Sequence, residues 1–333
     1  MVLHPSIISM IGASFLMSIM APYAAYYGLI IVRKWDLTRG SELQIELEKR
    51  TYLISTLLTY ILGFQLISLF LYVYTADNLK NMFVGAMCAA GTLSVNRYGF
   101  PALIVKMFTF ILCSLWIILN YVDMKGYDYP LIKKKYILLI SITPFILADT
   151  VLQFLYFINL KADVITSCCG TLFRPDSKNI VSDMTSFPTS AMKTVFYTVM
   201  FLTILSGLYY YKRERGGYFF STAVFLTFII SIGSIISFIS LYYYEIPTHH
   251  CPFCILKEEY GYIGYPIYFT LFGGAVSGIG AGMLTPFRRY KSLEVDLPII
   301  QSRLTFISIF LYSLFTIIVT YRIIFSDFIH DGY

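Results

Sequence analysis

Eight long apolar stretches recur along the chain, and they constrain its fold more than any other feature of the sequence. A helix needs roughly 20 apolar residues to cross the hydrocarbon core of a membrane, and each stretch meets that length. The connections are too short to fold as separate domains, the longest being about residues 160–192. The sequence therefore predicts an all-α polytopic integral membrane protein with eight transmembrane helices, at about residues 6–32, 51–75, 100–121, 136–158, 193–211, 218–243, 262–286 and 304–325.

The distribution of charge predicts the orientation of these helices. The alternate connections 33–50, 122–135, 212–217 and 287–303 hold 16 of the 25 Lys and Arg residues. Such clusters mark the cytoplasmic side, so we expect both termini outside. In a bacterium the chain would lie in the cytoplasmic (inner) membrane and face an oxidising periplasm. The net charge of +6 is then a topology signal that can touch anionic lipid, and it indicates no nucleic-acid partner.

The two halves of the chain share a short pattern. Gly99–Pro101 opens the third apolar stretch and Gly264–Pro266 opens the seventh, 165 residues later. Cys88 lies 11 residues before the first glycine, and Cys254 lies 10 before the second. A parallel duplication would give a four-helix unit over 1–160 and a second over 161–333, the latter carrying the CC and CPFC cysteines.

Five of the six cysteines fall on or near the predicted exterior side: Cys88, Cys168, Cys169, Cys251 and Cys254. Cys113 lies in the middle of an apolar stretch, where cysteine usually acts as a small packing residue. The motif HHCPFC, residues 249–254, places His249 and His250 directly before the CxxC. Three interpretations are open: a structural disulfide, a redox-active dithiol, or a site for zinc or copper with the histidines as additional ligands.

The CxxC has a specific chemistry if it opens a helix. The helix N-terminus then lowers the pKa of Cys251 and makes it the attacking thiolate, with Cys254 as its partner. At helical spacing Cys251, Cys254, Glu258 and Tyr262 share one face. Lys257 and Glu258 can tune the dithiol or contact a ligand head group.

A CxxC at the exterior start of a membrane helix, followed by polar residues and then Tyr and Pro, resembles the quinone-linked disulfide-generating membrane proteins (the DsbB and vitamin K epoxide reductase group). The resemblance implies electron transfer from a periplasmic thiol protein, through a loop cysteine pair and the CxxC, to quinone. It assigns Cys168 and Cys169 to the loop pair, with quinone near Lys257, Glu258 and Tyr262. Two features depart from that group. The loop cysteines are adjacent in the sequence, and Lys257-Glu258 replaces the Arg that commonly follows the CxxC.

The order Cys88, then Cys168-Cys169-Gly170, then the CPFC motif is similar to the CCG cysteine-rich domain of heterodisulfide reductase, which holds an iron–sulfur cluster. That likeness implies a metal or cluster site formed by the same cysteines. The leading hypothesis is thiol–disulfide or electron-transfer chemistry at the exterior cysteines. The alternatives are a metal or iron–sulfur protein, and a structural subunit of a larger, respiratory-type membrane complex with structural disulfides.

Three further groups of residues lie inside the apolar stretches. Asp149 lies deep in the fourth stretch, with Gln153 one turn later on the same face, which indicates either a proton relay or ligand contact, or a carboxyl hydrogen-bonded to a neighbouring helix. Lys106 is expected to extend toward the membrane surface. Gly274, Gly278 and Gly282 form overlapping GxxxG units and predict close packing against another helix of the chain, with a partner helix or a bound flat ring as the alternative.

Overall fold

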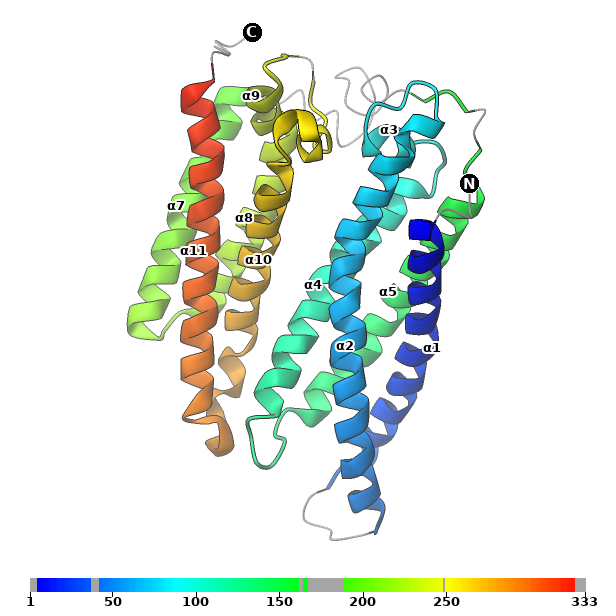
Figure 1. Cartoon of the computed structure of the whole chain (residues 1–333). Coiled ribbons are helices and arrows are strands. Elements are labelled where there is room, and N and C mark those ends of the chain that lie inside the picture. Colours follow the sequence, from blue (N-terminus) through cyan, green and yellow to red (C-terminus); the bar gives the residue numbers. More distant parts are fainter. Residues whose placement is uncertain (1–4, 37–41, 162–163, 167–187, 248, 327–333) are drawn as a thin grey trace. The chain divides into compact units, whose positions relative to one another are not determined.

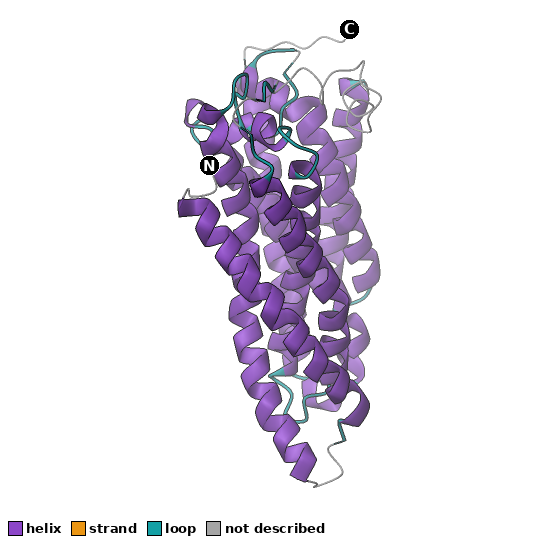
Figure 2. Cartoon of the chain, turned by 90° about the vertical axis from the view of Figure 1, so that its right-hand side faces the viewer, coloured by secondary structure: helices purple, strands orange, loops and turns teal. Residues whose placement is uncertain are grey.

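The structure is a computed structural model that describes residues 5–36, 42–161, 164–166, 188–247 and 249–326. Within these ranges the chain consists of helices and loops, with no strand (Figure 2). Eight of the described helical segments are long and apolar enough to cross a membrane. The prediction of an all-α polytopic protein is confirmed in this part of the chain.

The chain divides into two compact units. The first contains Met1–Phe83, Thr92–Val164 and Phe287–Leu297, and the second contains Val84–Gly91, Ile165–Pro286 and Pro298–Tyr333. Two segments depart from a simple division at residue 160. Phe287–Leu297 belongs to the first unit, and Val84–Gly91, which carries Cys88, belongs to the second.

The first unit is a ring of four long helices (Figure 1): α1 (Pro5–Lys34), α2 (Glu42–Asn78), α4 (Gly99–Asp123) and α5 (Ile132–Ile158). Helix α1 packs on α2 and α5, and α4 also packs on both of these. A short helix η1 (Leu79–Met82) ends α2, α3 (Ala89–Leu93) precedes α4, and η6 (Lys291–Leu293) belongs to the same unit. The core between the four helices is apolar and includes Cys113 and Trp116, both fully buried.

Two buried ion pairs join α4 to α5 in this unit. Lys106 Nζ on α4 lies 3.0 Å from Asp149 Oδ2 on α5, and Lys135 Nζ on α5 lies 2.7 Å from Asp123 Oδ2 on α4. All four side chains are at most 2% exposed. The expectation that Lys106 extends to the membrane surface is wrong, because its ammonium is neutralised inside the bundle. Lys135 likewise belongs to a buried pair, although the sequence grouped it with the basic connection 122–135.

The second unit contains α7 (Thr189–Arg213), α8 (Gly217–Ser234), α10 (Gly264–Met283) and most of α11 (Asp296–Phe325). Helix α8 continues through one π-helical turn, η2 (Ile235–Ile239), into α9 (Ser240–Tyr244). Short turns η3 (Cys254–Leu256), η4 (Glu258–Tyr260) and η5 (Thr285–Arg289) flank α10. Helix α8 packs between α7 and α10.

The glycines of α10 provide close contacts within this second unit. A Cβ added at Gly278 would lie 2.6 Å from both Ser308 Oγ on α11 and Val224 Cγ2 on α8. A Cβ at Gly282 would lie 2.2 Å from Ser221 Cβ on α8. The predicted packing of the GxxxG surface inside the chain is confirmed.

Large apolar side chains are exposed on the outer faces of the long helices. Examples are Phe15 on α1, Tyr60 on α2 and Phe306 on α11, each more than half exposed. Side chains of this size are rarely left in water in such numbers. Lipid contact along the spans accounts for this surface.

Candidate metal centre

Three cysteines from two distant segments meet in the second unit. The Sγ atoms of Cys88, Cys251 and Cys254 all lie within 4.8 Å of one another, and all three residues are buried. Cys88 Sγ lies 3.4 Å from Cys251 Sγ, although 163 residues separate them. No disulfide bond joins two of the cysteines that the structure describes. The three thiols could hold a metal ion.

Cys88 is positioned by a tight turn that only glycine can make. Gly85 has φ +86, and a Cβ there would lie 2.0 Å from the Thr166 carbonyl oxygen. The Thr166 N–H donates to the Val84 carbonyl oxygen over 2.9 Å, which ties the turn to the chain at 164–166. After the turn, the Gly91 N–H donates to the Cys88 carbonyl oxygen and begins α3. The turn therefore fixes Cys88 directly before a helix.

Two tyrosine hydroxyls fix the backbone of the CPFC segment. The Tyr244 hydroxyl donates to the Cys251 carbonyl oxygen and accepts the Ile255 N–H over 2.9 Å. The Tyr268 hydroxyl donates to the Pro252 carbonyl oxygen over 2.6 Å. Both tyrosines are on helices that enclose the segment, α9 and α10. The CPFC backbone is thus tied to rigid elements on both sides.

The segment 251–262 is not a helix, and the prediction that the CxxC opens one is wrong. It forms the short turns η3 and η4, Lys257 between them is extended, and α10 begins only at Gly264. Tyr262 has φ 56, which a continuous right-handed helix excludes. Cys251, Cys254, Glu258 and Tyr262 therefore share no helical face.

The expected activation of Cys251 is also wrong. Burial raises the pKa of Cys251 well above its ordinary value, and the neighbouring Cys254 and Cys88 thiols raise it further. Without a metal ion, the thiol form is stabilised in this site. A bound metal ion reverses this preference, because it holds a coordinating sulfur as thiolate.

The other predicted site residues of this region that the structure describes lie outside the three-thiol group. His249 packs its ring edge-on against Tyr244, and His250 Nδ1 lies 2.9 Å from the Ile236 carbonyl oxygen. Lys257 Nζ lies 3.8 Å from Glu259 Oε2, and Tyr262 is half exposed beside Tyr265. Glu258 is exposed. Cys168 and Cys169 lie outside the described residues.

Asp149 and Gln153 are in the first unit, in the four-helix bundle. Besides Lys106, Asp149 Oδ2 accepts a hydrogen bond from Gln65 Nε2 over 2.6 Å, and Gln153 Nε2 donates to Ser14 Oγ over 3.0 Å. The two residues thus bond to α2, α4 and α1. Sequence reasoning missed Lys106 as the partner of Asp149. The signal for it was a charged residue of opposite sign in the preceding, antiparallel span.

The two Gly-aromatic-Pro motifs have one structural role in common. Gly99 begins α4 and Gly264 begins α10. A Cβ at Gly99 would lie 2.2 Å from the Leu93 carbonyl oxygen, and one at Gly264 would lie 2.9 Å from the Ile255 carbonyl oxygen. Each glycine lets a helix start against the backbone that follows a cysteine of the site. The duplication itself stays a prediction.

Comparisons with known proteins give no relative for this chain: no family model, no curated protein and no solved structure matches it.

Proposed function

We propose that this integral membrane protein binds a thiophilic metal ion, with zinc(II) as the first candidate, through Cys88, Cys251 and Cys254. The observation that carries the proposal is the meeting of three buried thiols from segments 163 residues apart. Zinc–sulfur bonds of about 2.3 Å put two sulfurs on one tetrahedral ion about 3.8 Å apart. The three sulfurs, all within 4.8 Å of one another, need only small shifts to reach that geometry.

The donor set favours a soft or borderline ion. Thiolates select zinc and copper(I), whereas magnesium and calcium take oxygen ligands. An iron–sulfur cluster, as the likeness to the CCG domain implies, is usually held by four cysteines, and the described part of the chain offers three. On a tetrahedral zinc ion the same three sulfurs would leave one position for a further ligand.

A thiol–disulfide relay is the second candidate function. Its support is the 3.4 Å separation of Cys88 Sγ and Cys251 Sγ, which would have to shorten to about 2.05 Å for a disulfide. Forming that bond releases two protons and two electrons, and quinone is the acceptor that the resemblance to the disulfide-generating group implies. The burial of all three cysteines counts against it, because a partner protein must reach one sulfur.

Metal analysis combined with thiol counting separates the two functions. The protein is purified in detergent without chelator, as wild type and as Cys88→Ser, Cys251→Ser and Cys254→Ser variants. Cys113→Ala is the matched control, because Cys113 is buried in the first unit and lies outside the cluster. We expect about one equivalent of zinc or copper in the wild type and the control, and its loss in each of the three serine variants.

The relay gives the opposite result. The native wild-type protein would then contain no metal. After denaturation without reductant, it would show two fewer reactive thiols than the reduced protein. Metal-free protein whose cysteines stay fully reduced in air would contradict both functions. Metal that survives all three serine substitutions would place the ion elsewhere and overturn the assignment of this site.

A further inference from the structure

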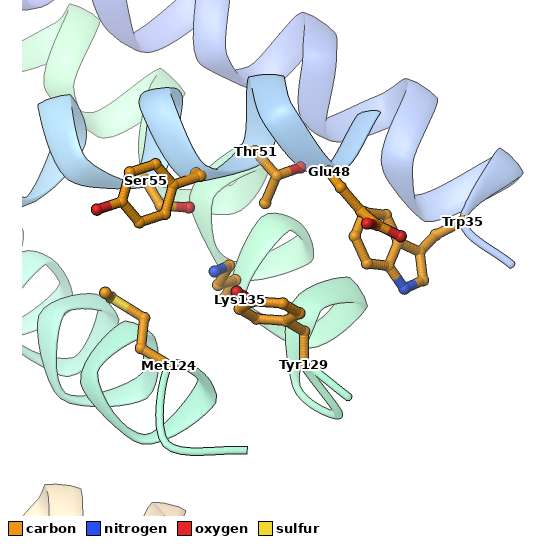
Figure 3. A pocket seen from close by; sticks show the side chains of 8 residues that line it. Trp35, Glu48, Thr51, Ser55, Met124, Tyr129 and Lys135 are labelled. Atoms are coloured by element: carbon orange, nitrogen blue, oxygen red, sulfur yellow. The ribbon is translucent and has the colours of Figure 1, made fainter. Parts of the chain in front are cut away.

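The first unit contains a cavity at the end of the bundle where α2 begins. It has a volume of about 90 Å³ and lies between the end of α1, the first turns of α2 and the connection from α4 to α5. Figure 3 shows the side chains of Trp35, Glu48, Thr51, Tyr129 and Lys135 gathered around one space. The cavity is in a different unit from the cysteine cluster, and the proposed metal site does not involve it.

Among the residues that the structure describes, the charged groups of the cavity carry one more negative than positive charge. Lys135 Nζ lies 2.7 Å from Asp123 Oδ2 and donates to Asn120 Oδ1 over 3.0 Å, so its positive charge is already neutralised. The half-buried Glu48 accepts a hydrogen bond from Gln44 Nε2 over 2.9 Å. No ion pair of Glu48 is found within the ranges that the structure describes. The described lining of the cavity is therefore complementary to a cation.

Three aromatic side chains line the same space as Glu48: Trp35, Tyr52 and Tyr129. Aromatic rings attract ammonium groups through their negative faces, and sites for quaternary ammonium are built from such rings with a carboxylate nearby. Tyr129 has φ 45, a backbone conformation rare for a bulky residue and common at ligand sites. The Thr51 and Ser55 hydroxyls can accept hydrogen bonds from an N–H group.

The size and position of the cavity limit the ligand further. Its volume of about 90 Å³ is well below the roughly 300–1,000 Å³ of pockets that hold drug-sized ligands. This space takes an ammonium head group and excludes a whole sugar or nucleotide. Exposed charged residues of the first α2 turns, Glu46, Lys49 and Arg50, place this end of the bundle at the level of the membrane surface.

We propose that this cavity binds an organic ammonium group, supplied by a phospholipid head group or by a free amine of the same chemistry. Glu48 provides the counter-charge, and Trp35, Tyr52 and Tyr129 provide the aromatic walls. Lys135 forms the floor as part of a neutral pair with Asp123.

Binding of small ammonium probes tests the proposal. Choline chloride and ethanolamine hydrochloride are titrated into the full-length protein in detergent, against sodium chloride at equal ionic strength. Trp35 reports binding by its fluorescence, and the melting temperature gives an independent reading. Glu48→Gln keeps the size of the side chain and should raise the Kd of both probes at least about tenfold. Glu46→Gln, an exposed carboxylate paired with Arg50 outside the cavity, is the matched control and should leave the Kd unchanged.

Two further variants keep the test decisive if Glu48→Gln folds poorly. Tyr52 is 65% exposed, so Tyr52→Leu should fold normally and still weaken both probes. Thr51→Val removes one acceptor and should weaken ethanolamine more than choline. Absence of saturable binding by either probe in the wild type, or equal affinity in wild type, Glu48→Gln and Tyr52→Leu, would overturn the proposal.

Nanodiscs of defined composition identify the source of the ammonium group. If a lipid head group occupies the cavity, phosphatidylethanolamine or phosphatidylcholine discs should raise the melting temperature of the wild type relative to Glu48→Gln, and added choline should have little further effect. If the ligand is a free amine, choline should act equally in those discs and in phosphatidylglycerol discs. Either pattern supports the ammonium site, and no dependence on probe, lipid or Glu48 contradicts it.

Discussion

The Lys106–Asp149 pair predicts a large loss of stability when one partner is removed. Replacing Lys106 by methionine keeps the length of the side chain and leaves Asp149, 1% exposed, without a counter-charge. Gln65 Nε2 at 2.6 Å remains as its hydrogen-bond donor. Breaking a buried pair in this way typically costs about 3–5 kcal/mol.

A variant without either charge gives an independent value for this cost. The double variant Lys106→Met/Asp149→Leu supplies this independent value, because it removes both charges and leaves only the change in packing.

Unfolding in sodium dodecyl sulfate, followed by circular dichroism, measures the loss of stability. Lys80→Met is the matched control, because Lys80 and Asp77 form a partly exposed pair at 2.8 Å, and its loss should cost at most about 1 kcal/mol. The double variant Lys106→Met/Asp149→Leu should recover at least half of the loss, since no buried charge remains. A Lys106→Met variant as stable as Lys80→Met, or a double variant no more stable than Lys106→Met, would refute the reasoning.

Four further predictions concern the metal site, the packing of α10 and the topology. Tyr244→Phe leaves the Cys251 carbonyl oxygen and the Ile255 N–H without their hydroxyl partner. Metal affinity, measured by chelator competition, should therefore fall about 10–100-fold. Tyr262→Phe, at a half-exposed residue, is the control and should leave the affinity unchanged. Gly278→Val should destabilise the second unit by about 1–3 kcal/mol in detergent denaturation, because the added Cβ would overlap Ser308 and Val224. Gly12→Ala should be neutral, because an added Cβ there would have no neighbouring atom within 4 Å. Equal effects of the two variants would contradict this account. The sequence prediction that Cys168 or Cys169 joins the site is checked by metal stoichiometry of the Cys168→Ser/Cys169→Ser variant: a loss supports it and an unchanged value removes both residues from the site. The Cys168→Ser/Cys169→Ser variant also serves to test the orientation. With Glu259→Cys added, an impermeant reagent should label the protein in intact cells, and with Tyr127→Cys it should not, although both positions are exposed. The reverse result would overturn the orientation inferred from Lys and Arg.

The spans were predictable because hydropathy and length depend on composition alone. The stretch 136–158 corresponds to α5, and 218–243 corresponds to α8 with its continuation through η2 and α9. The same property could not place Lys106 or Lys135, because hydropathy gives the depth of a residue and not the direction of its side chain. Each lysine is buried by an aspartate on the partner helix, and that information lies in the packing of two segments.

The cysteine site was predictable in part. The sequence grouped Cys88 with the CPFC pair, through the spacing to the Gly-aromatic-Pro motifs, and the structure brings these three thiols together. The conformation of 251–262 was not predictable from helical spacing. Gly261 and Tyr262 both adopt positive φ, which a continuous helix excludes. The tyrosines that hold the segment come from α9 and α10, and no spacing rule connects Tyr244 or Tyr268 to Cys251.

The separation of Cys88 from Cys251 has a consequence for biosynthesis. Ribosomes add about 5–20 residues per second, so the 163 residues between them take roughly 8–30 seconds to make. During that interval Cys88 is already outside the ribosome, and the chain must thread several more helices into the membrane before the CPFC segment arrives. A chain truncated before residue 251 carries one of the three thiols. Metal loading would therefore mark only those chains whose translation and insertion have passed the sixth span.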